Sequence, residues 1–284
     1  MIIKNNISLK NFTTIRIGGN SKKIYFPESI EDISNLKKIL LSPKTLIIGK
    51  GSNIAFSDNG YKSDIISLSK YDKTEISVID DKYISITASV SCARLAKFCH
   101  KQSIAGFEFL HGIPGTIGGA LAMNAGAFQQ SIWNYVDSVN IVNKEGSIKN
   151  ISHKKIKTSY RNVDKNNILL FLDVLLVINK NKVFDKNLLM EYSRHRSMTQ
   201  PIKQWSSGCI FKNPSKGIPA SSLIDSLEIK KRKIGGIYIS KKHCNYFIND
   251  GSGSCEDLIK LIKYVEELIK KKYNISVTRE ICIY

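Results

Sequence analysis

The chain has 284 residues, of which 42% are hydrophobic, so it is long enough for two or three compact units with a substantial core. Its formal net charge is +19, but lysine is spread along the whole chain and the densest basic run, at 230–233, contains no aromatic residue, so nucleic-acid binding is disfavoured. No apolar run approaches the roughly 20 residues that span a bilayer, and the N-terminus lacks the apolar segment of a signal peptide, which favours a cytoplasmic protein without a membrane partner.

Cysteine usage agrees with a reducing compartment. The six cysteines form no CxxC pair and no Cys/His cluster with the spacing of zinc ligands; they stand at positions 92, 99, 209, 244, 255 and 282. We therefore expect reduced thiols and no metal site.

The first seventy residues predict a strand, a helix and another strand. Residues 23–26 read as a strand and residues 27–41 as a helix, with Ser29 and Asp32 spaced as a capping box. A strand over 45–48 then runs into GKGSN at 49–53, where successive amides suit an anion. Since the motif is not GxGxxG and no helix is predicted after it, it indicates neither a Rossmann nor a Walker site, and a purely structural turn is the favoured interpretation of these residues alone.

A long glycine-rich stretch lies near the middle of the chain, after predicted strands over 64–68 and 83–88 and a helix that begins at Ser91. The stretch, HGIPGTIGGALAMNAGAF at 111–128, has five glycines and no charged residue after His111. Glycine permits close backbone approach at an entropic cost. The backbone here is therefore expected to lie against either another part of the protein or a ligand, and these residues alone do not choose between the two.

The remainder of the chain predicts further alternation of strands and helices. Strands are expected over 135–142, 147–151 and 168–178, then a polar helix over 180–200 that Pro201 ends. A small helix from about 220, strands near 237 and 245–249, and a helix over 255–273 with a cap signal at Ser254 and Asp257 follow. A final strand over 275–283 would place Glu280 on its polar side, and the whole chain is of mixed α and β character.

Seven motifs in this order resemble one known family. They are NFTTIRIGG, IIGKGSN, GFEFLHGIPGTIGGALAMNAGAF, YR, SSGCIFKNP, IGGIYISKKHCNYFIN and the final TRE. The chain is similar throughout to the UDP-N-acetylenolpyruvoylglucosamine reductases, flavoenzymes that make UDP-N-acetylmuramate for bacterial peptidoglycan. It looks too short in its C-terminal part for the inserted loop of the first type, and so resembles the second type.

The resemblance implies an α+β architecture and a cofactor. The expected FAD-binding domain, of the vanillyl-alcohol-oxidase (PCMH) type, covers residues 1–184 in two α+β subdomains, 1–68 and 69–184. An α/β substrate-binding domain over 185–284 follows, and its last strand, 275–284, returns Glu280 to the active site. FAD is the implied cofactor and NADPH the co-substrate. The implied cofactor-binding residues are Gly49, Lys50, Gly51, Ser52, Asn53, Gly115, Thr116, Gly118, Gly119, Ala120 and Asn124.

The resemblance also implies a ping-pong cycle and three catalytic residues. NADPH reduces FAD and leaves; the enolpyruvyl ether of UDP-N-acetylglucosamine then enters the same cleft and receives hydride from flavin N5. Arg161 matches the arginine that stabilises the developing charge, Glu280 the glutamate that works with it, and Cys209 the proton donor, which is serine in many members. With an ordinary pKa of about 8.5, a thiol is protonated near neutrality and can donate. The implied substrate-binding residues are Lys212, Asn213, His243 and Asn245.

Two other classes of function remain as alternatives. One is another FAD-dependent oxidoreductase on the same fold, against which the motifs within residues 205–284 argue. The other is a basic nucleic-acid-binding protein, which leaves the glycine-rich stretch unexplained. Without the resemblance, Cys209 would be a core thiol, Arg161 a surface arginine and Glu280 a salt-bridge partner. The expected partners are small molecules; the sequence leaves the oligomeric state open, with a monomer favoured.

Overall fold

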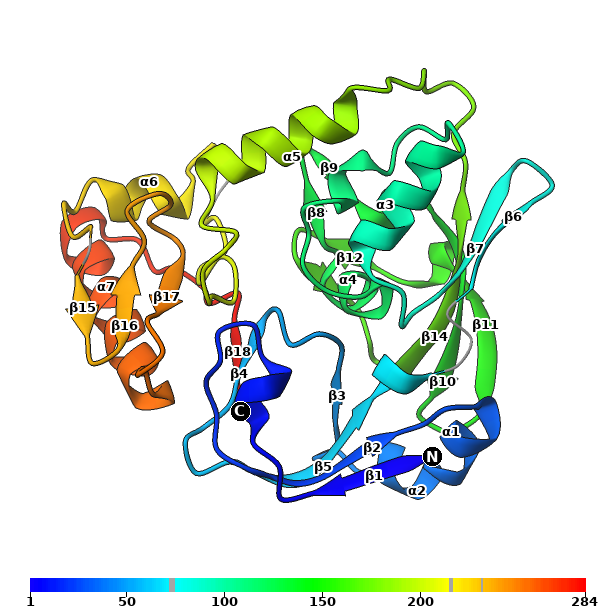
Figure 1. Ribbon diagram of the computed structural model, residues 1–284, viewed down its shortest axis with the longest axis horizontal. Coiled ribbons are helices and arrows are strands. Elements are labelled where there is room, and N and C mark those ends of the chain that lie inside the picture. The colour runs from blue at the N-terminus through cyan, green and yellow to red at the C-terminus, as the bar shows by residue number, and fades with distance from the viewer. Residues whose placement is uncertain (72–74, 215–216, 231) are drawn as a thin grey trace. The chain divides into compact units, whose positions relative to one another are not determined.

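The computed structural model describes residues 1–71, 75–214, 217–230 and 232–284, so Lys231 of the basic run lies outside the described residues. The chain forms two compact units, each assembled from three stretches (Figure 1). Unit 1 contains Met1–Lys4, Lys23–Lys50 and Ser63–His195, and unit 2 contains Asn5–Lys22, Gly51–Lys62 and Arg196–Tyr284. The predicted FAD-binding and substrate-binding domains, 1–184 and 185–284, were defined by what each binds and not by contacts. The division into two units does not test them, and they stay a prediction.

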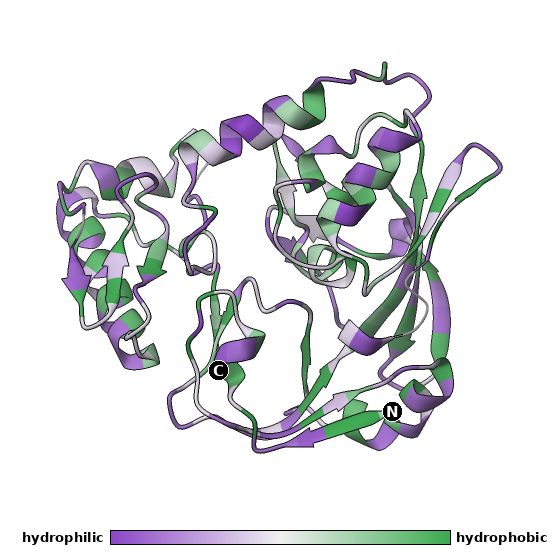
Figure 2. Ribbon diagram, in the orientation of Figure 1, coloured by the Kyte–Doolittle hydropathy of each residue, from purple (hydrophilic) through white to green (hydrophobic). Residues whose placement is uncertain are grey.

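Unit 1 is built on a five-stranded antiparallel sheet of order β11-β10-β14-β7-β6. Its central strand β14 (Ile168–Val177) carries apolar residues on both faces, as its hydrophobic sequence with the single charged residue Asp173 predicts, and Figure 2 draws it mostly green. The strands predicted over 83–88, 135–142, 147–151 and 168–178 are confirmed. Around β14 the sheet comprises β6 (Ile76–Ile79), β7 (Tyr83–Thr87), β10 (Val136–Asn143) and β11 (Ile148–Ser152).

Two helices, α3 (Cys92–Lys101) and α4 (Ile117–Met123), lie on one face of this sheet (Figure 1). Ser91 caps α3 as predicted, its Oγ accepting from Arg94 N at 3.3 Å. The helix α4 inside the glycine-rich stretch was not predicted, because Gly118 and Gly119 disfavour a helix. Thr116 overcomes this by capping it: its Oγ1 accepts from Gly119 N at 3.3 Å.

The rest of unit 1 consists of short elements. The helix predicted over 27–41 is interrupted at Leu36, which separates α1 (Ile30–Asn35) from α2 (Lys37–Leu40). Ser29 caps α1, but the Asp32 carboxylate accepts from Glu28 N, so the reciprocal half of the predicted capping box is absent there. The remaining strands are β1 (Ile2–Asn5), β2 (Ser21–Phe26), β3 (Leu46–Ile48), β5 (Tyr61–Ser67), β8 (Gly126–Ala127), β9 (Gln130–Ser131), β12 (Thr158–Ser159) and β13 (Asn162–Val163). Short 3-10 helices of unit 1 lie at Leu68–Lys70, Glu108–Leu110, Ile132–Asn134 and His153–Lys155, and another at Leu9–Phe12 belongs to unit 2.

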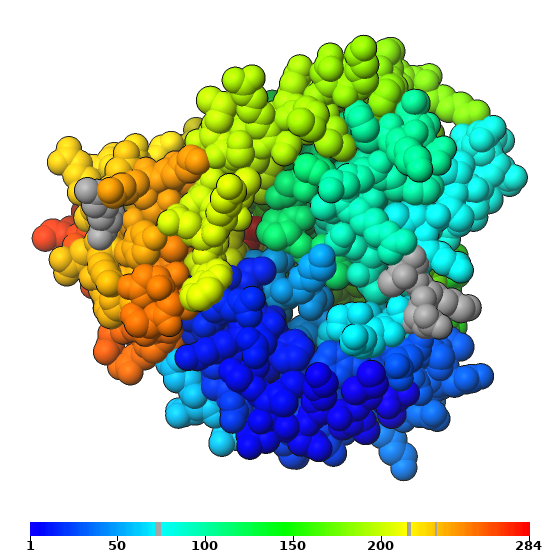
Figure 3. Space-filling model, in the orientation of Figure 1, coloured from blue at the N-terminus to red at the C-terminus, as the bar shows by residue number. Residues whose placement is uncertain are grey.

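Unit 2 packs the long helix α7 (Cys255–Tyr273) against the antiparallel sheet β15-β16-β17. The bounds of α7 are those predicted, although Ile269 and not Leu268 is fully buried on its apolar side. Ile15, Ile17 and Ala55, from the two early stretches, belong to the same core, which explains their assignment to this unit. Thr14 Oγ1 donates to Ser206 O at 2.7 Å. In Figure 3, blue atoms from the early part of the chain lie against yellow atoms from its last third. The other elements are α6 (Ala220–Asp225), β15 (Lys233–Ile234), β16 (Ile237–Ile239) and β17 (Phe247–Asn249).

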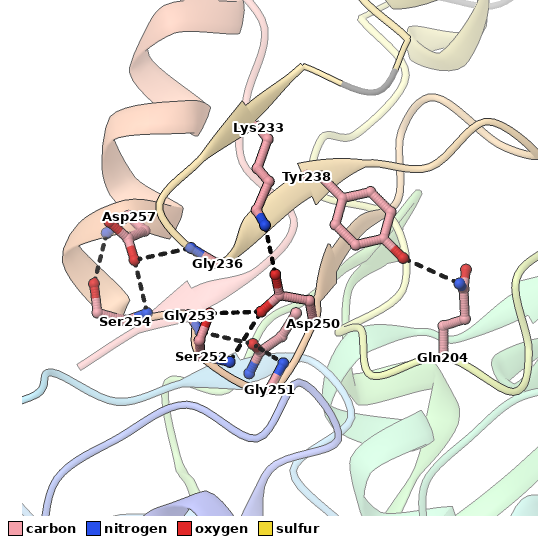
Figure 4. Close-up of polar contacts among 11 residues, drawn as sticks. Gln204, Lys233, Gly236, Tyr238, Asp250, Gly251, Ser252, Gly253, Ser254 and Asp257 are labelled. Carbon is pink, nitrogen blue, oxygen red and sulfur yellow. Dashed lines mark hydrogen bonds and ion pairs between the residues drawn. The ribbon is translucent and has the colours of Figure 1, made fainter.

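The start of α7 is held by several polar contacts (Figure 4). The predicted capping box is complete, with Ser254 Oγ accepting from Asp257 N and Asp257 Oδ2 accepting from Ser254 N, both at 3.0 Å. Lys233 pairs with Asp250 at 2.7 Å and holds the pKa of that carboxyl well below its ordinary value. From the earlier stretch, the Asp58 carboxylate accepts the first two helical amides, at 2.9 and 3.1 Å.

Two predicted elements are shorter than expected. The helix predicted over 180–200 covers only α5 (Leu188–Thr199). Regular strand structure within 275–283 is limited to β18 (Cys282–Ile283), which pairs in parallel with β4 (Ile54–Ala55). Glu280 N and Ile281 N both donate to Ile210 O, at 2.7 and 3.5 Å, so two residues oppose one, as in a β-bulge. The predicted apolar residues Ile275, Val277, Ile281 and Ile283 nevertheless pack on the core of unit 2, so the alternation holds without a continuous strand. No helix within the described residues is long and apolar enough to cross a bilayer.

Replacing Ser254 by Ala tests the cap of α7. The variant loses the acceptor for Asp257 N, and we expect the free energy of unfolding to fall by about 1 kcal/mol in a urea titration. Ser276→Ala, at an exposed position outside any helix, is the control and should change it by less than about 0.5 kcal/mol. Equal losses in the two variants would contradict a specific role of the cap.

Candidate active site

The two glycine motifs meet in unit 1. A Cβ on Gly49 would lie 2.7 Å from Thr116 Oγ1, so the end of β3 and the start of α4 are in contact only because residue 49 has no side chain. Gly115 has a φ of +132°, and its carbonyl accepts from Cys92 N at 3.2 Å. The structure thus brings together two segments that lie more than sixty positions apart in the printed sequence.

The neighbouring glycines of α4 face different surroundings. A Cβ on Gly118 would lie 3.0 Å from Ala88 Cβ, and Gly118 N donates to Ala88 O at 2.8 Å, so this glycine packs on the end of β7. A Cβ on Gly119 would come within 4 Å only of Thr116 Oγ1, at 3.6 Å, among the described atoms. Glycine at 118 is therefore required by close packing within the protein, whereas the position of a Cβ on Gly119 faces open space that suits a ligand.

Asn124 and Arg161 form the other end of this region. Asn124 ends α4 in the left-handed conformation and donates from Nδ2 to Ser159 O at 2.9 Å. Its Oδ1 is buried and has no hydrogen-bond partner among the described residues. Arg161, at the β12–β13 turn, donates to Asn124 O at 3.3 Å and to Gly126 O at 2.8 Å. A buried acceptor beside a fixed guanidinium suits a polar cofactor ring with donor groups.

Residues 51–53, the second half of GKGSN, belong to unit 2 and contact residues of that unit. Gly51 has a φ of +62°, and a Cβ there would lie 1.8 Å from Phe12 O, so only glycine is accommodated. Asn53 Nδ2 donates to Glu280 O at 2.9 Å, and Asn53 O accepts from Cys282 N at 3.0 Å. Sequence reasoning missed this contact, which ties the second half of GKGSN to the predicted catalytic glutamate.

The segment at 208–213 carries Cys209, and three neighbours fix its backbone. Asn245 pairs with Phe211 through both ends of its amide, at 2.9 and 2.8 Å. Lys212 N donates to Thr278 O at 2.8 Å, and Cys209 forms an isolated antiparallel bridge with Tyr246. The structure brings Cys209 and Glu280 into neighbouring segments, since the Glu280 amide donates to the residue after Cys209.

The cysteines differ in access to solvent. Cys92, Cys99, Cys244 and Cys255 are buried, whereas Cys209 and Cys282 are half-buried. Burial raises the pKa of Cys92 to about 12 and that of Cys255 to about 11, so both stay protonated and inaccessible. Cys209 combines partial access with a position next to Ile210, whose carbonyl accepts from the Glu280 amide, while Cys282, also half-buried, lies two residues after Glu280. No group of three or more His, Cys, Asp or Glu side chains suited to a metal occurs among the described residues.

Two predicted substrate ligands have structural partners as well. Asn213 Oδ1 accepts from Ala220 N at 3.0 Å, at the start of α6. The His243 ring lies against Tyr246, with ring centroids 4.7 Å apart, and burial lowers its pKa, so the imidazole is neutral at neutral pH. Neither contact assigns a substrate role, which stays a prediction for both residues and for Lys212.

The predicted site residues therefore fall into two groups. Each group is held within its own unit, and the turn GKGSN contributes to both. Unit 1 contains Gly49, Lys50, Gly115, Thr116, Gly118, Gly119, Ala120, Asn124 and Arg161, and unit 2 contains Gly51, Ser52, Asn53, Cys209, Lys212, Asn213, His243, Asn245 and Glu280.

The first half of the chain is similar to a known family of cofactor-binding domains. Residues 21–152, which include the glycines of both motifs, match the family described as FAD binding domain. This makes the chain a flavoprotein of that fold, and the open face at Gly119 and the buried Asn124 acceptor fit such a cofactor.

Residues 200–284 match the C-terminal domain of UDP-N-acetylenolpyruvoylglucosamine reductase. Reductases of that name from Legionella pneumophila (strain Corby) and Rickettsia canadensis are 33% and 34% identical over 98% of this chain and 91% and 94% of theirs. The crystal structure of the Thermus caldophilus reductase superposes with a TM-score of 0.82 at 25% identity and covers both chains completely. The chain belongs to the UDP-N-acetylenolpyruvoylglucosamine reductase family, and the α+β fold expected from the sequence is confirmed.

Substitution of the two glycines of α4 separates packing from cofactor binding. Gly119→Ala should keep or raise the stability of the apoprotein, since Ala favours a helix by up to about 1 kcal/mol, yet weaken FAD binding about tenfold or more. Gly118→Ala, crowded against Ala88, should instead destabilise the apoprotein. FAD titration and urea unfolding measure both; unchanged FAD affinity in Gly119→Ala would remove this face of α4 from the cofactor site.

Proposed function

We propose that the chain reduces the enolpyruvyl ether of UDP-N-acetylglucosamine to UDP-N-acetylmuramate, a peptidoglycan precursor, with NADPH as reductant and FAD as cofactor. The observation that carries the proposal is the match of an FAD-binding domain and of this reductase's C-terminal domain in one chain. Another flavin oxidoreductase on the same fold would share the first match but not the second. A cytoplasmic location follows from the proposed substrates; monomeric state and absence of nucleic-acid or membrane partners stay predictions.

The chain offers backbone and side-chain groups for the cofactor. Gly49, Thr116 and Gly119 would hold its diphosphate, because their mutual contacts leave one backbone face of α4 open. Asn124 would meet the flavin through its buried Oδ1. When bound, FAD supplies hydride transfer, taken up from NADPH and given to the methylene carbon of the enol ether.

Three side chains would complete the reduction. Hydride addition to the methylene carbon pushes negative charge toward the substrate carboxylate, where Arg161, in concert with Glu280, would stabilise it. Cys209 would then give its thiol proton to the carbon that bears the carboxylate, which completes the saturated ether. The partial solvent access of Cys209 supports this role, since its thiolate has to regain a proton before the next cycle.

The proposed substrate-binding residues divide by their contacts. The Lys212 ammonium would bind anionic oxygens of the substrate, and the neutral His243 ring would offer a hydrogen bond. Asn213 and Asn245 would act by shaping the segment that carries Cys209, because their amides bond to the backbone of Ala220 and Phe211.

Purification tests the cofactor directly. We expect a yellow protein, or a colourless one that becomes yellow with FAD, whose flavin is bleached by NADPH under anaerobic conditions. Reoxidation by the enolpyruvyl substrate should yield one UDP-N-acetylmuramate per flavin. A preparation that takes up no FAD would refute the proposal, and flavin bleaching without substrate-driven reoxidation would favour another oxidoreductase.

Cys209→Ala tests the proton donor. NADPH should still bleach the flavin at the wild-type rate, while reoxidation by substrate should slow by about 100-fold or more, the usual contribution of a positioned acid. Stopped-flow absorbance separates the two half-reactions. Cys209→Ser is the matched control and should recover much of the second rate, because a hydroxyl can also donate; equal rates in Cys209→Ala and wild type would overturn the assignment.

A further inference from the structure

The backbone around Glu280 has few regular supports. Between Asn274, which ends α7, and β18, the chain forms no helix or strand; its one isolated bridge joins Arg279 to Phe211. Glu280 itself is held by its amide, which donates to Ile210 O, and by its carbonyl, which accepts from Asn53. A side-chain anchor next to Glu280 therefore matters more here than it would in a continuous sheet.

Arg279 supplies such an anchor. Its Nε and Nη2 donate to the two carboxylate oxygens of Glu266, at 2.6 and 2.7 Å. The exposed fractions of the two side chains are 37% and 25%, lower than the 57% and 72% of the Lys260–Glu256 pair on the same helix. A two-bonded contact between planar groups fixes orientation as well as distance, which a single surface ion pair does not.

Glu266 is a rigid partner because of where it lies on α7. Its neighbours Val265, Ile262 and Ile269 are completely buried in the core of unit 2. The carboxylate that holds Arg279 is thus anchored to a helix whose apolar face is buried in the core of the unit. Glu266 also raises the pKa of the Arg279 guanidinium, so this side chain stays charged.

We propose that Glu266, through Arg279, is a positioning residue for Glu280 in the protonation half of the reaction. The inference rests on the proposed function, since it takes Glu280 as part of the catalytic group. The Glu266–Arg279 contact fixes the residue before Glu280, and Asn53 and Ile210 fix Glu280 itself. Loss of Glu266 removes the side-chain contact that orients Arg279, while the backbone contacts of this segment to Ile210, Phe211 and Lys212 remain. A displacement near 1 Å of the Glu280 carboxylate would then cost up to about 100-fold in rate.

Glu266→Ala and Glu266→Gln test the proposal in the holoenzyme. Flavin reduction by NADPH should stay at the wild-type rate in both variants. Reoxidation by the enolpyruvyl substrate should slow by roughly tenfold to 100-fold in Glu266→Ala, and less in Glu266→Gln, which keeps hydrogen-bonding atoms. Glu256→Ala, on the same helix but in an exposed pair, is the matched control and should leave both half-reactions unchanged.

A double-mutant cycle separates positioning from a general loosening of unit 2. In a Glu280→Gln background, Glu266→Ala should slow reoxidation no further, because the group it positions is already altered. An equal slowing by Glu266→Ala in both backgrounds would overturn the proposal. It would also be overturned if Glu266→Ala reoxidised at the wild-type rate while Glu280→Gln reoxidised slowly. If Glu280→Gln itself reoxidised like wild type, the catalytic assignment of Glu280 would fail and this inference with it. The bound-flavin spectrum reports whether each variant is folded.

Discussion

One side-chain oxygen, Thr116 Oγ1, accepts from the amide of Gly119 in the first turn of α4 and occupies the place where any side chain on residue 49 would lie. A seven-residue helix with two adjacent glycines would be marginal alone, because glycine costs up to about 1 kcal/mol per position relative to alanine. The cap, the packing of Gly118 on Ala88 and the closeness of Gly49 together hold it in place. The open backbone face beside Gly119 exists only because these contacts are satisfied.

Single side chains also fix the backbone in unit 2. There Cys209, the proposed acid, and Glu280, the proposed carboxylate, lie on segments without regular structure. Side-chain amides replace the backbone hydrogen bonds that a sheet would supply. Asn53 donates to the carbonyl of Glu280, and Asn245 bonds to both the amide and the carbonyl of Phe211. Such contacts are directional, and each fixes one peptide group. They give short segments a defined geometry without the length of strand that a sheet requires.

The long periodic elements α7 and β14 were predictable from the sequence, and so were short ones such as β3 and α6, whereas α4 was not. The apolar spacing and the Ser254 cap define α7, and the hydrophobic run at 168–178 defines β14, because both signals are local. The helix α4 is obscured by its glycines, and the bulge at Glu280 depends on Ile210, seventy positions away in the chain. Likewise, Asn53 reads as a loop residue beside glycines; its bond to Glu280 is visible only once the chain is folded. The roles proposed for Arg161, Cys209 and Glu280 came from the resemblance, since each residue alone has an ordinary structural explanation.

The composition of unit 2 from three separate stretches has a consequence for its folding. Its core joins Ile15, Ile17 and Ala55 to residues of the last third of the chain, and β4 pairs with the terminal β18. Contacts this distant in sequence give a high contact order and slow folding. During synthesis, the stretches 5–22 and 51–62 leave the ribosome long before residues 196–284 exist to cover them. Unit 1, whose main sheet is complete by Val177, can form first, and apolar residues of the early stretches stay exposed to aggregation until residues 196–284 emerge.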